Sequence, residues 1–249
     1  AKLLNPKAEV VLLDADASCS LVKETNINKL EKWLSKYPDH THVSYINSSV
    51  EHKALSDWIV TSRNARSIID MLIARGEKVI FSPDYNMGNY FNKMFDWNMP
   101  IWKATCEVHK RFVVPRLENG AILIAHPESN INVLDEAAFV GSTSALLHFV
   151  DIYEGNLLAT IYVATEDGIL HNMRMLRPDL KIEQAPTNKG FLPFSPKKCE
   201  CNSCPYMKMN TLEKINLTIA GESGIIININ EELREKALIP LNRMIEHKL

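Results

Sequence analysis

The chain has five cysteines, at positions 19, 106, 199, 201 and 204, and these are its most evident candidates for holding a metal. An odd number of cysteines without a secretion signal argues against a disulfide framework. Thiolates are soft ligands that suit zinc or the iron of iron–sulfur clusters. The last three form the dense block Cys199-Glu-Cys201-Asn-Ser-Cys204, whereas Cys19 and Cys106 each follow a strand-like segment.

Two kinds of metal centre fit this spacing. In one, three thiolates from different parts of the chain hold a [4Fe–4S] cluster, and its fourth iron stays open to bind a substrate oxygen as a Lewis acid. In the other, the block from Cys199 to Cys204 binds a structural zinc ion together with a nearby histidine. Cysteine spacing alone leaves both centres open.

Polar residues just past predicted strands form a second set of candidates, because α/β folds bind ligands there. His126-Pro-Glu128 brings an imidazole and a carboxylate to one strand end, and either group can serve in acid–base catalysis. Tyr45 and Asn47 hold the corresponding places after an earlier strand. A His-x-Glu sequence is common, so it indicates catalysis only in combination with other features.

Ser62 and Thr143 lie where a strand is expected to run into a helix. A hydroxyl there acts together with unpaired backbone N–H groups and the positive end of the helix dipole, which suits a carboxylate or a phosphate. Plain N-capping needs the same residue types. Capping is the simpler interpretation of one such residue, but the pattern recurs at equivalent points of two repeats, so both anion binding and capping stay open.

The elements that position these residues alternate between strand and helix. Short apolar runs predict strands, and amphipathic stretches between them predict helices. The predicted strands are Val10–Leu13, His42–Ile46, Trp58–Val60 and Lys78–Phe81, and the predicted helices Asn28–Lys36, Ser49–Asp57 and Ser62–Arg75. This succession predicts an α/β fold with parallel strands and helices on both faces.

The second half of the chain repeats the first. Val43–Ser48 aligns with Ile124–Ser129 at a shift of 81 residues, and Ile59–Ser62 aligns with Val140–Thr143 at the same shift. Agreement of separate blocks on one offset indicates homologous αβα units. We expect a second unit at 20–105, a third at 106–204, and a remnant of a first unit at 1–19, which joins 205–249 with its C-terminal helices.

Composition narrows the class of protein. The chain is 46% hydrophobic and 23% charged, as globular proteins are, and its net charge of −2 creates no field that would attract nucleic acid or an anionic membrane. It contains no apolar run near the roughly 18 residues of a membrane span and no signal-peptide pattern. We expect a soluble cytoplasmic protein. Ala1–Pro6 has the pattern of a last helical turn, so we also expect that an N-terminal portion precedes it.

A series of motifs runs in order through nearly the whole chain. They are Ser18-Cys-Ser-Leu21, Tyr45-Ile-Asn-Ser48, Thr61-Ser-Arg-Asn-Ala65, Cys106-Glu-Val-His109, His126-Pro-Glu128, Val140-Gly-Ser-Thr143, Thr165-Glu-Asp-Gly168 and Cys204-Pro-Tyr-Met-Lys-Met-Asn-Thr-Leu212. In these motifs and their spacing the chain resembles the quinolinate synthases, iron–sulfur enzymes of NAD biosynthesis.

This resemblance implies a pseudo-threefold arrangement of similar αβα units with short parallel sheets, the first unit being incomplete in this chain. It also implies that Cys19, Cys106 and Cys204 bind a [4Fe–4S] cluster. Cys204 is preferred within its block because the family's Met-Lys and Asn-Thr-Leu follow it directly. Cys199 and Cys201 would then be non-ligands available for redox chemistry.

The resemblance further implies that iminoaspartate condenses with dihydroxyacetone phosphate to give quinolinate, and that the enzyme supplying iminoaspartate is a functional partner. Catalysis would rest on Glu128, His126 and Tyr45. The expected substrate-binding residues are Tyr45, Asn47, Ser62, His109, His126, Glu128, Ser142 and Thr143. In the family a His, a Tyr and a Ser of the first unit also contribute, and this sequence has no corresponding segment. The alternatives are a zinc-binding structural or interaction protein and a non-catalytic binder of sugar phosphates or carboxylates.

Overall fold

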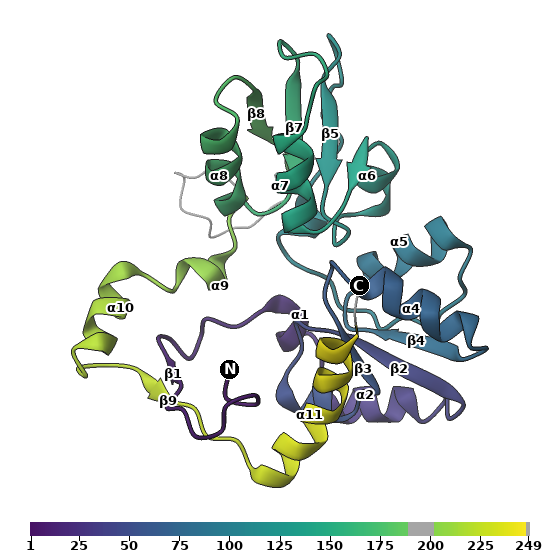
Figure 1. Ribbon diagram of the computed structural model, residues 1–249, viewed down its shortest axis with the longest axis vertical. Helices are drawn as coiled ribbons and strands as arrows, with labels where there is room; N and C mark the ends of the chain where they lie inside the picture. The colour runs from purple at the N-terminus through teal and green to yellow at the C-terminus, as the bar shows by residue number, and fades with distance from the viewer. Residues whose placement is uncertain (189–201, 248–249) are drawn as a thin grey trace. The chain divides into compact units, whose positions relative to one another are not determined.

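The computed structural model describes residues 1–188 and 202–247, which fold into two compact units (Figure 1). The first unit consists of Ala1–Asp84, Asn98–Ala104 and Pro205–Leu249, and the second of Tyr85–Trp97 and Thr105–Cys204. Each unit contains its own parallel β-sheet. No helix among the described residues is both long enough and apolar enough to cross a lipid bilayer.

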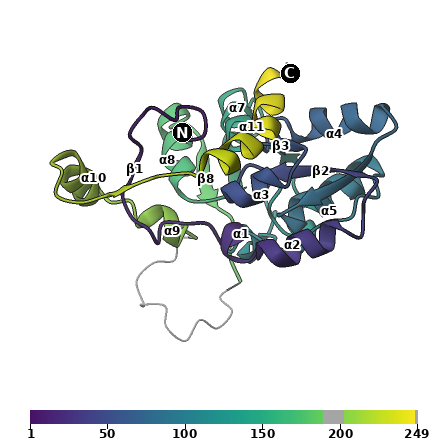
Figure 2. The same cartoon turned by 90° about the horizontal axis from the view of Figure 1, so that it is seen from below.

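The first unit is built on strands β2 (His40–Tyr45), β3 (Trp58–Val60) and β4 (Lys78–Ser82), which pair in parallel in the order β3-β2-β4. Its helices include α2 (Ile27–Leu34), α3 (Val50–Ala54), α4 (Ala65–Ala74) and α11 (Glu231–Glu246). Helix α11 packs against α3 and β3, as Figure 2 shows, and buries Leu241 with Leu3 and Ile59. Segments from both ends of the chain therefore complete this unit.

The second unit is built on a four-stranded parallel sheet in the order β6-β5-β7-β8. Its strands are β5 (Ile122–Ala125), β6 (Phe139–Val140), β7 (Thr160–Ala164) and β8 (Lys181–Gln184). Its helices are α5 (Tyr85–Phe95), α6 (Ile131–Asp135), α7 (Thr143–Asp151) and α8 (Gly168–Leu176), with the short 3-10 helix η1 (His109–Arg111). One of its apolar cores, which we call the inner cluster, consists of Val108, Phe112, Leu123, Ala125, Val133, Leu134, Ala164 and Ala185.

The internal repeat predicted from the sequence is present in the strand pairing. Val43 of β2 lies opposite Trp58 of β3, and Ile124 of β5 lies opposite Phe139 of β6, so both partners are displaced by 81 residues. On the other side, Val43 pairs with Phe81 whereas Ile124 pairs with Val163, so these partners are displaced by 82 residues, one more than the rest of the repeat. Helices α3 and α6 keep the offset of 81 at both of their ends. The two sheets thus share one topology, β3-β2-β4 matching β6-β5-β7.

The predicted α/β class with short parallel sheets is confirmed, but three local expectations were wrong. The helix predicted at Ser49–Asp57 ends at Ala54. Val10–Leu13 was expected to be a buried strand, but β1 (Val11–Leu12) is only half-buried and pairs antiparallel with β9 (Ile225–Ile226). Helix α4 begins three residues after Ser62, because the Asn64 side chain accepts a hydrogen bond from the Thr61 backbone at 2.6 Å and holds a turn there. The pseudo-threefold axis and the three-part division stay predictions.

The remaining described elements are short: α1 (Ser20–Lys23), α9 (Pro205–Lys208) and α10 (Leu212–Ile219). They lie in the first unit.

A buried hydrogen-bonded network of histidine and serine side chains ties α3 to the first sheet. His42 Nε2 and His52 Nε2 each lie 2.7 Å from Ser82 Oγ, and Ser44 Oγ lies 3.1 Å from both His42 Nε2 and Ser82 Oγ. The Leu55 carbonyl accepts a hydrogen bond from His42 Nδ1 at 2.8 Å. Burial disfavours the charged imidazoles and lowers the pKa of His42 to about 4 and that of His52 to about 3. Both rings are therefore neutral at pH 7.

The first unit should lose stability as the pH falls from 7 to 5. An unfolded histidine has a pKa of about 6.5, so the unfolded chain takes up protons before the folded chain does. The stabilisation is complete above pH 6.5 and is lost as the pH falls toward 4, by about 2 kcal/mol per histidine at pH 5. Urea unfolding followed by tryptophan fluorescence measures this, because Trp33, Trp58 and Trp102 lie in the first unit. The change His52→Gln should reduce the pH dependence, and equal unfolding free energies at pH 7 and pH 5 would contradict the assignment.

Candidate active site

The polar residues of the second unit meet at the carboxyl ends of β5 and β7. Ala125 and Ala164 are register partners at the ends of these strands, so His126 and Thr165 leave the sheet side by side, and the Ala164 carbonyl accepts a hydrogen bond from the His126 backbone at 3.1 Å. Glu128 follows on the same turn, and His109 comes from η1. Backbone direction thus brings side chains from three segments to one edge of the sheet.

Glu128 is the centre of this group. Its side chain is almost completely buried, and a buried carboxylate needs hydrogen-bond donors. His109 Nδ1 lies 3.1 Å from Glu128 Oε2 and 3.2 Å from Cys106 Sγ. A carboxylate accepts hydrogen bonds, so a proton on His109 Nδ1 can be donated to Glu128, and His109 Nε2 lies 3.2 Å from the Thr165 hydroxyl. One imidazole therefore connects a carboxylate, a thiol and a hydroxyl.

His126 stacks on His109, with ring centroids 4.8 Å apart. Burial lowers the pKa of His126 to about 4, although the nearby Glu128 charge opposes the shift, so the ring is neutral at pH 7. The Glu128 backbone N–H donates to His126 Nδ1 at 3.4 Å, which requires that Nδ1 carry no proton. The separation of 3.9 Å between His126 Nδ1 and Glu128 Oε1 is therefore a contact and not an ion pair.

Two residues that support this site were not among the predicted site residues. Asn86 of α5 is buried, and its side-chain amide donates to the Glu128 carbonyl at 2.9 Å. Thr165 belongs to a motif noted in the sequence, but no role was assigned to it. The contact between the Thr165 hydroxyl and His109 depends on the pairing of β7 with β5, which the sequence alone does not give. For Asn86, which lies in the middle of a helical pattern, the sequence held no such signal.

The site also contains donors suited to a metal. One ligand atom each from Cys106, His109 and Glu128 lie within 4.8 Å of one another. Cys106 and Cys204 are partly buried thiols that pack against the inner cluster, and the Cys204 backbone N–H donates to Glu166 Oε1 at 3.2 Å. Soft donors against an apolar wall fit iron or zinc. Cys199 and Cys201 lie outside the residues that the structure describes.

The other predicted residues of the second unit lie at the start of α7. Ser142 is the N-cap residue, and its hydroxyl accepts a hydrogen bond from the Ala145 backbone at 3.3 Å. Thr143 is the first residue of the helix and is exposed. Capping was considered for Thr143, but the residue that caps α7 is its neighbour Ser142, and Thr143 is an exposed residue of the first helical turn.

Four predicted residues belong to the first unit and are described within it. Tyr45 ends β2 and is buried, whereas Asn47 is exposed on the following turn. The shift of 81 residues places them at the positions that His126 and Glu128 hold in the second unit. Ser62 lies in the turn before α4, and Cys19 is the N-cap residue of α1.

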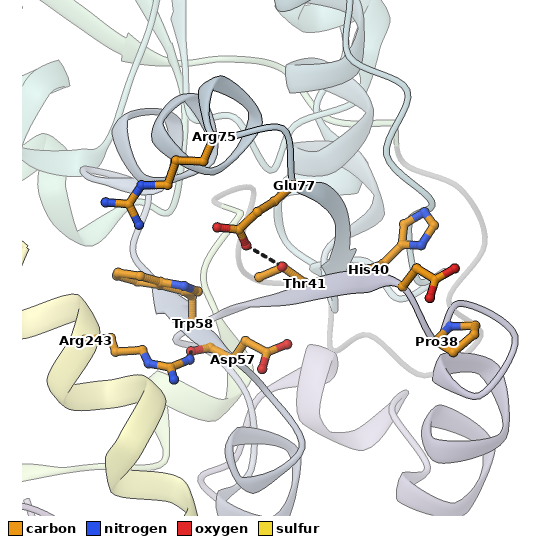
Figure 3. Close-up of a pocket in the computed structure, with 9 residues that line it drawn as sticks. Pro38, His40, Thr41, Asp57, Trp58, Arg75, Glu77 and Arg243 are labelled. Atoms are coloured by element: carbon orange, nitrogen blue, oxygen red, sulfur yellow. Dashed lines mark hydrogen bonds between the residues drawn. The ribbon is translucent and has the colours of Figure 1, made fainter.

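A cavity of about 700 Å³ lies at the other end of the first sheet (Figure 3). Its lining residues are Pro38, Asp39, His40, Thr41, Asp57, Trp58, Arg75, Glu77 and Arg243. Figure 3 shows the Trp58 indole between the guanidinium groups of Arg75 and Arg243. The cavity lies beside the first residues of β2, at the opposite end of that strand from Tyr45, and its lining mixes carboxylates with guanidinium groups. No residue of the predicted site lines it.

Comparison with known proteins gives one consistent family. Residues 1–246 match the family model described as quinolinate synthetase A protein. Quinolinate synthase from Microcystis aeruginosa is 39% identical over 252 residues, which cover 99% of this chain and 75% of that protein. Quinolinate synthases from Thermosynechococcus vestitus and Chloroherpeton thalassium are 39% and 38% identical, each over 99% of this chain, with 75% and 74% of their own lengths covered.

Proposed function

The chain belongs to the quinolinate synthase family, and on that premise we propose that it condenses iminoaspartate with dihydroxyacetone phosphate. The products are quinolinate, phosphate and two water molecules. The observation that carries the proposal is the buried group of Glu128, His109 and His126 beside the Cys106 thiol, within a chain that matches the family from residue 1 to 246. Removal of two waters requires proton carriers, and this group supplies them.

The proposed cofactor is a [4Fe–4S] cluster held by Cys19, Cys106 and Cys204, with Cys199 and Cys201 as non-ligands. Two observations support it: Cys106 and Cys204 pack against one apolar cluster of the second unit, and Cys19, Cys106 and Cys204 are not joined in disulfides. When bound, a cluster with three protein ligands supplies an open iron that polarises a substrate hydroxyl as a Lewis acid.

Glu128 is the proposed proton carrier. Its carboxylate is buried and hydrogen-bonded to His109, so it is held in one place while it takes a proton from a substrate carbon or returns one to a leaving hydroxyl. His126 is neutral at pH 7 and can therefore donate from Nε2 to a substrate oxygen without adding charge to the site. Tyr45 of the first unit is the third proposed catalytic residue, and it would also bind the substrate.

Both substrates are anions, and the remaining predicted residues would bind them. The Ser62 and Thr143 hydroxyls lie at or just before helix starts, where backbone N–H groups favour a carboxylate or a phosphate. Asn47 offers an exposed amide, and Ser142 contributes through the helix N-terminus that its hydroxyl caps. The enzyme that supplies iminoaspartate is the proposed functional partner, because imines hydrolyse readily in water.

Serine at position 19, 106 or 204 should abolish the cluster, since an alkoxide-forming hydroxyl is a poor replacement for a thiolate on iron. Iron and sulfide analysis after anaerobic purification measures this. The matched controls are Cys199→Ser and Cys201→Ser, which should keep about four irons per chain. Full iron and sulfide in Cys106→Ser would remove that residue from the ligand set. A colourless protein with about one zinc per chain would instead support a structural zinc site.

The change Glu128→Gln should retain the cluster and lower the rate of quinolinate formation by at least about 100-fold, because a neutral amide cannot carry a proton. The amide keeps the size of the carboxylate and can still accept from His109, so the fold should persist. Iron content and product formation are measured on the same preparation. Turnover near that of the unchanged protein would exclude Glu128 from the chemistry.

A further inference from the structure

Lys53 of α3 is a buried lysine beside the turn that follows β2. Its side chain is 8% exposed, and its ammonium group donates to the Ile46 carbonyl at 2.9 Å, to the Ser48 carbonyl and to the Ser48 hydroxyl at 3.1 Å. The Ser48 hydroxyl in turn donates to the Tyr45 carbonyl at 2.8 Å. Lys53 is therefore hydrogen-bonded to Ile46 and Ser48, the two residues on either side of Asn47.

The number of hydrogen-bond donors on a charged Lys53 matches the number of acceptors around it. An ammonium group has three N–H donors and here meets three acceptors, whereas a neutral amine would leave one of them without a donor. The Ser48 oxygen can accept from Lys53 because its own hydrogen points to Tyr45. Burial lowers the pKa of Lys53 to about 8, so the charged form still predominates at pH 7.

The repeat shows that the fold itself does not require a lysine here. Helices α3 and α6 correspond at a shift of 81 residues, and the residue of α6 that matches Lys53 is the buried Leu134. An apolar residue therefore satisfies the same place in the same topology. In the second unit the turn that carries Glu128 is held by a different donor, Asn86. Burying a lysine costs more than burying a leucine, so its presence points to the turn that it holds.

We propose that Lys53 is a positioning residue, which fixes the turn from Tyr45 to Ser48 so that the Tyr45 and Asn47 side chains meet the substrate in one orientation. This inference rests on the proposed function for its catalytic consequence. Its structural half, the fixing of the turn, holds or fails independently of any activity. Lys53 itself touches backbone carbonyls and one hydroxyl, and it acts on the reaction through the turn.

The experiment replaces Lys53 by methionine, which keeps the length of the side chain and removes its donors. Amide hydrogen exchange of the peptide spanning 45–49, measured on cluster-free protein, should become at least about tenfold faster. Quinolinate formation should show a KM raised about tenfold or more with a smaller change in kcat, because substrate orientation is lost while the proton carriers remain. Lys53→Arg should recover part of both effects, since it restores a charged donor.

Lys36→Met is the control, because Lys36 is an exposed lysine of the same unit and the three bonds to the turn come from Lys53. If Lys53→Met fails to fold, Ser48→Ala tests the same link by removing one acceptor and the bond to Tyr45, and should shift exchange in the same direction. Unchanged exchange at 45–49 in a folded variant would overturn the proposal. Faster exchange with unchanged KM would overturn its catalytic half. Absence of quinolinate formation by the unchanged protein would instead contradict the proposed function.

Discussion

The burial of one carboxylate sets the requirements for the rest of the candidate site. Glu128 is 3% exposed, and a charge so far from water is tolerated only where donors surround it. His109 supplies one donor at 3.1 Å, and Asn86 holds the backbone of the same residue. These partners come from η1 and α5, so the arrangement of the turn after β5 depends on the packing of both elements against it. The stacked, neutral His126 completes the enclosure.

The two sheets place different chemistry on one backbone plan. At the end of the central strand the second unit carries His126 and Glu128, whereas the first carries Tyr45 and Asn47. A titratable pair suits proton transfer, and a phenol with an amide suits recognition of a bound anion. The supports of the two turns also differ, a buried lysine in one unit and a buried asparagine in the other. The two halves of the internal repeat thus share one topology, whereas the residues at their strand ends differ in chemical function.

Sequence patterns predicted the residues at the strand ends, but they did not predict the residues that hold those strand ends in place. The period of the apolar runs and the 81-residue repeat located β2, β3, β5 and β6, and the family motifs drew attention to His109, His126 and Glu128. Thr165 and Asn86 act through contacts between elements far apart in the chain, which no local pattern encodes. Lys53 on a short helix is typical of a solvated face, and only its burial reveals another role. The choice between capping and anion binding was drawn for Thr143, whereas the structure gives the cap of α7 to Ser142, one residue earlier.

The roles proposed for these residues all depend on quinolinate formation by a cluster-containing protein, which can be measured on the unchanged chain. The unchanged protein is purified without oxygen, its iron and sulfide are determined, and quinolinate is quantified after addition of dihydroxyacetone phosphate and freshly generated iminoaspartate. We expect a brown protein with about four irons per chain that forms quinolinate only when both substrates are present. A cluster-loaded protein that forms none from both substrates would contradict it.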